Sequence, residues 1–78
     1  MDINMNRINE HLEKQIGNTV TLSAKKLFYI LSPDEEYKEI RYELLKILKK
    51  IEKTPPEGFV VDDIRRVNNR LKVILRKI

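Results

Sequence analysis

The sequence predicts an all-α fold, a small bundle of three or four helices that ends in an antiparallel helical hairpin. Three observations lead to this prediction. Apolar residues recur at helical spacings along most of the chain, the letters "SPDE" at 32–35 are typical of a helix start, and the last two apolar segments share a heptad spacing. We expect residues 1–78 to form one domain, because a chain of this length buries a single small core.

Two helices are predicted before the first proline. The first spans roughly 2–16, because its apolar residues recur at every third or fourth position and Gly17 follows as a stop signal. The second spans 23–31, with Ser23 placed to accept an N-cap hydrogen bond. It is expected to end near Ser32, because Pro33 disfavours the α conformation in the residue before it.

The segment "NTVTL" between these two helices alternates threonines with Val20 and Leu22. β-branched residues in alternation favour an extended segment over a helix. Two alternatives stay open, a short two-stranded β pairing of 19–22 with 59–61 and a loop.

A third helix is predicted over 33–53. Ser32 is expected as its N-cap, Pro33 as its first residue and Glu35 as the partner that closes a capping box. Acidic residues crowd the start of this segment and lysines crowd its end, as the helix dipole favours. Its apolar residues have heptad spacing: Tyr37, Ile40, Leu44, Ile47 and Ile51.

A fourth helix is predicted over 60–77, because its apolar residues step by four and three along the same kind of seam: Val60, Ile64, Val67, Leu71, Ile74 and Ile78. The short turn "TPPEGF" joins it to the preceding segment, so an antiparallel helical hairpin is expected. The first two helices offer little apolar surface to cover both seams. A helical homodimer is therefore expected.

Enzymatic chemistry is not expected. The chain has no cysteine and His11 is its one histidine, so the usual nucleophile–base pairs and a structural zinc site are excluded. Gly17 and Gly58 lie too far apart to form a phosphate-cradling loop. We expect no catalytic residue, no metal and no cofactor.

A membrane protein is not expected either. The sequence contains no apolar run of about eighteen residues, the length needed to span a bilayer. Its first residues carry charges every few positions and lack the basic start and apolar run of a signal peptide. These observations favour a cytoplasmic protein.

The excess positive charge lies in one segment. Residues 1–59 carry ten Lys or Arg and ten Asp or Glu, whereas residues 60–78 carry six Lys or Arg and two Asp. On a helix these cations would form two stripes that flank Asn69 and Val73. The candidate binding residues are therefore Arg65, Arg66, Asn69, Arg70, Lys72, Arg76 and Lys77.

Two functional hypotheses follow. In the first, the chain is a small non-enzymatic regulatory protein that presents a basic helix to an anionic partner, most concretely DNA or RNA, because Lys and Arg neutralise phosphates. The amides of Asn68 and Asn69 would approach base edges. In the alternative, the chain is a protein-interaction module, an adaptor or inhibitor that acts as a helical homodimer on the acidic surface of a larger protein.

Overall fold

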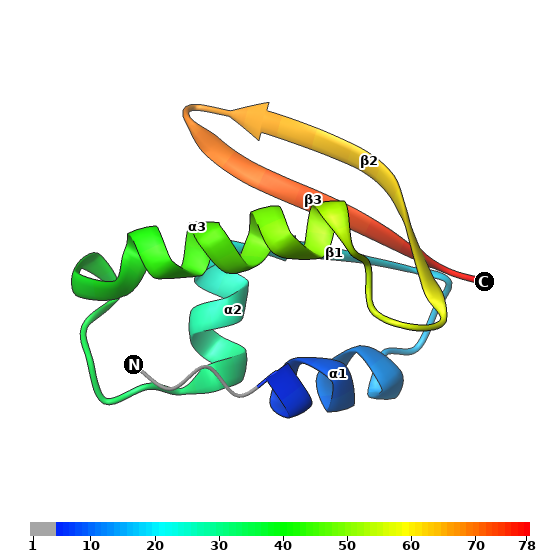
Figure 1. The fold of residues 1–78 in the computed structure, drawn as a ribbon, viewed down its shortest axis with the longest axis horizontal. Helices are drawn as coiled ribbons and strands as arrows, with labels where there is room; N and C mark the ends of the chain where they lie inside the picture. The colour runs from blue at the N-terminus through cyan, green and yellow to red at the C-terminus, as the bar shows by residue number, and fades with distance from the viewer. Residues whose placement is uncertain (1–4) are drawn as a thin grey trace.

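Residues 5–78 form an α+β fold of three helices and a three-stranded antiparallel sheet. In this computed structural model, α3 runs along the sheet, with α1 and α2 on one side of it and the β2–β3 hairpin on the other (Figure 1). The elements are α1 (Met5–Lys14), β1 (Thr19–Ser23), α2 (Ala24–Leu31), α3 (Tyr37–Lys53), β2 (Phe59–Val67) and β3 (Arg70–Lys77). The prediction of an all-α helical bundle is wrong, because the end of the chain forms strands.

The first two helices lie close to their predicted positions. α1 ends at Lys14, two residues before the expected end, and the expected start at residues 2–4 lies outside the described residues. α2 begins after Ser23, whose Oγ accepts a hydrogen bond from the Lys26 N–H at 3.1 Å. The predicted N-cap is confirmed.

The predicted capping box at Ser32 is wrong. Ser32 instead ends α2 in the left-handed conformation, with φ 44°, and its N–H donates to the Phe28 carbonyl at 3.0 Å. Its hydroxyl donates to the Tyr29 carbonyl at 3.2 Å, so it turns back to α2 and does not cap the next helix. α3 therefore starts at Tyr37, four residues later than expected, and ends at Lys53.

The segment predicted as a fourth helix over 60–77 is a β-hairpin. Its centre is the two-residue loop Asn68-Asn69, where both residues have positive φ, 52° and 62°. Positive φ at both central residues defines the type I′ turn, whose twist matches that of paired strands, and asparagine adopts it more readily than most residues. The buried residues of β3 alternate along the strand, so a period of two replaces the heptad period.

β3 is the central strand of the sheet, and β1 and β2 are its edges. The alternative of a pairing between 19–22 and 59–61 is wrong in its partner, because both segments form strands but each pairs with β3. The helical seam predicted over 60–77 is therefore absent, and the predicted helical hairpin is wrong. The seam of the third helix is present in α3, where Ile40, Leu44, Ile47 and Ile51 are buried in the core.

One face of the sheet packs on the helices. On this core face, every second residue of β1 and β3 is buried, and among the described residues no polar or charged side chain is buried. The buried residues of these two strands are Val20, Leu22, Leu71, Val73 and Leu75, and Phe59 at the start of β2 is buried as well. The alternate residues of these strands are exposed or half-buried, so the other face is open to solvent.

The outer half of the hairpin extends beyond the helices. Residues 62–70 are all exposed, and a β-bulge between Val61 and Asp63 shifts the register where this exposed part begins. A bulge bends a strand and increases its twist. The hairpin therefore diverges from α3 toward its turn, as Figure 1 shows.

Candidate functional site

The open side of the sheet, which we call the outer face, carries most of the candidate cations. Directly paired residues of neighbouring strands point to the same side of a sheet, so Ser23, Lys72 and Arg65 form one row across the three strands. The outer face comprises Thr19, Thr21, Ser23, Val60, Asp63, Arg65, Val67, Arg70, Lys72, Ile74 and Arg76.

Two of the four cations on the outer face are held by aspartates. Arg65 Nε lies 2.9 Å from Asp63 Oδ2, and Arg76 Nε lies 3.4 Å from Asp62 Oδ1. Within residues 5–78, neither Arg70 nor Lys72 takes part in an ion pair. These two are therefore the cations of the outer face with no carboxylate to displace.

The other two candidate cations, Arg66 and Lys77, are separated from this group. Arg66 pairs with Leu71 and so lies on the core side of the sheet, although it is exposed near the turn. Lys77 is half-buried, and its Nζ donates to the Gln15 carbonyl at 2.7 Å. Lys77 thus ties the end of the sheet to the segment after α1, a structural role that the sequence did not indicate.

A cavity of about 200 Å³ is lined by residues from the end of β1, the start of α2, the first half of α3 and the start of β3, and we call it the basic cavity. Four of its lining residues are cationic: Lys25, Arg41, Arg70 and Lys72. No Asp or Glu lines it, and none of the four forms an ion pair within residues 5–78. Positive charges around a concave surface raise the electrostatic potential inside it, because the contributions of the separate charges add.

The folding of separate segments brings these cations together. Lys25 lies in the first turn of α2, Arg41 one turn into α3, and Arg70 and Lys72 in β3. Tyr37, Leu45 and Asn69 also line the cavity. Lys25 and Arg41 were not among the predicted residues, because nothing local in the sequence links them to the terminal basic segment.

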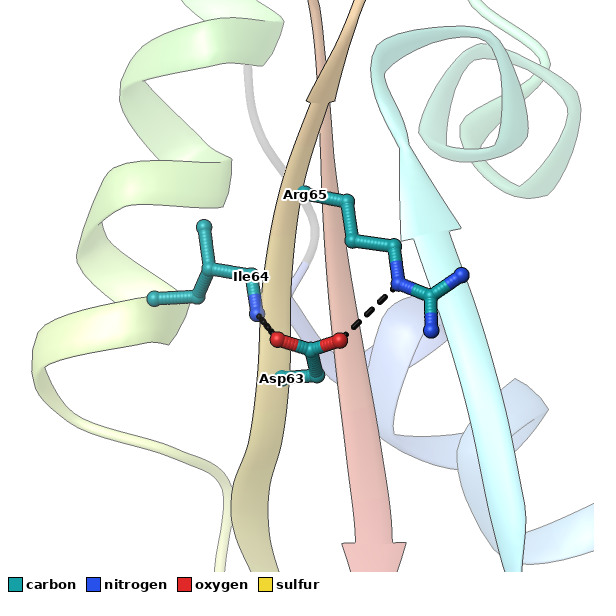
Figure 2. A network of polar contacts seen from close by, with 3 residues as sticks. All are labelled: Asp63, Ile64 and Arg65. Carbon is teal, nitrogen blue, oxygen red and sulfur yellow. Dashed lines mark hydrogen bonds and ion pairs between the residues drawn. The ribbon is translucent and has the colours of Figure 1, made fainter.

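Asp63 organises a small polar network at the outer edge of β2 (Figure 2). Its Oδ1 accepts from the Ile64 N–H at 2.8 Å, and its Oδ2 accepts from Arg65 Nε at 2.9 Å. The hydrogen bond from Arg65 lowers the pKa of the Asp63 carboxyl below its usual value, and the bond from the Ile64 N–H lowers it further. Asp63 is therefore ionised at neutral pH.

A second, more open hollow lies between α1 and α2. His11 and Lys26 line it together with Arg7, Glu10, Lys14, Tyr29 and Ile30. Burial lowers the pKa of His11, and the charge of Lys26 lowers it further. The ring is therefore neutral at pH 7, and its Nε2 lies 2.9 Å from Gln15 Nε2. Glu10 lines this hollow, so it lacks the all-cationic lining of the basic cavity.

The described residues offer little for metal chemistry. Within residues 5–78, no three His, Cys, Asp or Glu side chains gather in an arrangement that could hold a metal ion. None of the helices in the same range combines the length and apolar character needed to cross a membrane.

No protein family, curated protein or solved structure matches the chain.

Proposed function

We propose that the protein is a small non-enzymatic regulatory protein that binds DNA or RNA through the basic cavity and the adjoining outer face. The observation that carries this proposal is the lining of the cavity, four cations from three elements with no carboxylate among them. The predicted basic helix is replaced here by a strand and a turn, but Asn69, Arg70 and Lys72 of the predicted set contribute to the cavity.

The chemistry of the surface favours contact with the phosphate backbone. Arg and Lys bind phosphate oxygens, and such contacts position a nucleic acid without reading its sequence. Single-strand binders usually stack bases on exposed aromatic rings. The outer face carries no aromatic side chain, so we expect phosphate contacts to contribute more to binding than base stacking.

The size of the basic cavity favours part of a polymer over a complete small molecule. Its volume of about 200 Å³ is below the roughly 300–1,000 Å³ that is typical of small-molecule sites. One phosphate group with its sugar would fill such a space, and neighbouring phosphates would lie along Arg65 and Arg76 of the outer face.

The proposal is tested by binding of fluorescently labelled DNA and RNA oligonucleotides at several salt concentrations. We expect affinity to fall steeply with salt, because each neutralised phosphate releases counterions. Replacing Arg70 and Lys72 together by glutamine should reduce the salt slope by about two and weaken binding at least tenfold at low salt.

The matched control replaces Lys46 and Lys49 by glutamine. These two exposed lysines lie on α3 outside the basic cavity, so this variant has the same net charge as the first. Equal loss of affinity in both variants, or no binding of DNA or RNA by the unaltered protein at low salt, would contradict the proposal.

A second candidate is the protein-interaction module, and one observation favours it. β2 is an edge strand whose outer half is exposed, and Ile64 and Val67 on it are 40% and 50% exposed. Exposed edge strands pair readily with other strands, because their outward N–H and C=O groups lack partners.

A further inference from the structure

The edge strand β2 has a residue order that is complementary to itself. Residues 61–67 read "VDDIRRV", so valines flank two aspartates, a central Ile64 and two arginines. When two such segments run antiparallel with Ile64 opposite Ile64, every aspartate lies opposite an arginine. Opposite charges across paired strands stabilise the pairing, whereas like charges oppose it.

The backbone of Ile64 is oriented for this pairing. Its N–H donates to the Asp63 carboxylate and not to β3, so it points to the outer edge. In an antiparallel strand the N–H and C=O of one residue point to the same side. Ile64 therefore presents both groups outward, and two copies would exchange both hydrogen bonds at this residue.

The side chains at the edge also lie on suitable sides. Ile64 points toward α3, whereas Arg65 points to the opposite side of the strand (Figure 2). Asp63 and Arg65 both belong to the outer face. Antiparallel pairing about Ile64 would place each Asp63 beside the Arg65 of the second copy. It would also bring the two Ile64 side chains together.

The present contacts of Asp63 are readily exchanged. Its bonds to Ile64 and Arg65 lie in solvent, with the two charged side chains 47% and 65% exposed. Exposed ion pairs contribute only about 0–1 kcal/mol. Pairing would replace the N–H bond of Ile64 by a backbone bond and the internal ion pair by one between copies.

Charged residues often protect edge strands against pairing. Here the order of charges repels most strands but matches a second β2 in one register. The charges therefore make the strand specific for a second copy of itself. The bulge turns Asp62 toward Arg76, so the regular part of the interface is centred on Asp63, Ile64 and Arg65.

We propose that β2 is a homodimer interface in which two copies of the chain pair antiparallel about Ile64 and join their sheets into one. This proposal is independent of nucleic-acid binding. A two-fold axis at an antiparallel pair keeps both copies on the same side of the sheet, so the two outer faces form one continuous surface. Because the paired segment is short, the dimer is weak and depends on concentration.

Charge reversal with rescue tests the interface by sedimentation velocity over about 10 μM to 1 mM, in the absence of nucleic acid. Asp63→Arg places an arginine opposite Arg65 of the second copy twice in each dimer. We expect this variant to raise the dimer Kd at least tenfold. The double variant Asp63→Arg, Arg65→Asp restores both pairs and should return the Kd to within about threefold of the original.

The control variant is Glu43→Arg, which changes the net charge by the same amount at an exposed position of α3. It should leave the dimer Kd unchanged, and circular dichroism should show all variants folded. A chain that stays monomeric at 1 mM, an unaffected Asp63→Arg dimer, or a double variant as weak as the single one would overturn the proposal.

Disulfide cross-linking tests the register separately. The chain has no cysteine, so a single introduced thiol reports only on its own position. The Cα atoms of two Ile64→Cys residues would lie about 5.5 Å apart, which is within the range for a disulfide. The Cα atoms of two Val67→Cys residues would lie about 20 Å apart along the strands. We expect the first variant to form a covalent dimer in glutathione buffer far more readily than the second. Equal yields would overturn the proposed register.

Discussion

At the scale of single residues, the conformation of two asparagines decides the structure of the whole terminal segment. Asn68 and Asn69 both take positive φ, which most residues adopt only at a cost of about 1–2 kcal/mol. This two-residue turn lets Val67 pair with Arg70 and sets the register of the hairpin from there inward. The same turn brings Asn69 to the lining of the basic cavity.

Substitution of Asn69 tests this dependence. Asn69→Ala should lower the free energy of unfolding by about 1 kcal/mol, because alanine disfavours positive φ. Asn69→Gly should leave it unchanged or raise it slightly, because Asn-Gly is a preferred type I′ pair. Urea denaturation of both variants measures the difference. Equal stabilities of the two would show that the turn does not need this conformation.

At the scale of elements, local signals predicted the helices better than the strands. Ser23 and Pro33 bracket α2 as expected, because capping and the proline restriction depend on adjacent residues. Ser32 misled the prediction, since the same serine can end one helix or begin the next and the structure uses it as an end.

The terminal hairpin was mispredicted because its apolar residues fit both the heptad spacing of a helix and the alternation of a strand. Val60, Ile64, Val67, Leu71 and Ile74 have heptad spacing, yet Leu71, Val73 and Leu75 also alternate as in a strand. The many β-branched residues and the adjacent asparagines favoured the second interpretation. Packing against the helices settles the choice, because alternation buries three residues of β3 on one face.

A pair of substitutions separates the two periods experimentally. Val73 is fully buried on the core face, whereas Ile74 is half-buried on the outer face, the reverse of the heptad expectation. Val73→Thr should lower the free energy of unfolding by about 1–3 kcal/mol, because it buries a hydroxyl without a partner. Ile74→Thr keeps the β-branched shape and should cost less than about 1 kcal/mol. Thermal or urea unfolding compares them; a larger loss at Ile74 would contradict the observed register.

At the scale of the whole molecule, a sheet covered on one side explains why the site was only partly predictable. Four predicted cations, Arg65, Arg70, Lys72 and Arg76, share the outer face because strand residues alternate. A helical wheel places Arg65, Lys72 and Arg76 on one stripe and Arg70 on the other. Lys25 and Arg41 reach the basic cavity from distant segments, so their role depends on the tertiary fold and leaves no local signal.

The same one-sided arrangement predicts how stability is distributed. β3 pairs with strands on both sides and contributes buried side chains to the core, so its amides should exchange with solvent slowly. In dilute solution the Val73 and Leu75 amides should show protection factors of roughly 10³ or more.

The Ile64 amide offers the sharpest contrast within the same sheet. It points to the outer edge and donates only to the exposed Asp63 carboxylate, so in dilute solution it should exchange within about tenfold of an unprotected amide. Hydrogen exchange followed by NMR measures both classes in one sample. Pairing of β2 with a second copy would slow the Ile64 amide as protein concentration rises while leaving Val73 unchanged. Strong protection of Ile64 in dilute solution would show instead that this edge is covered within the monomer.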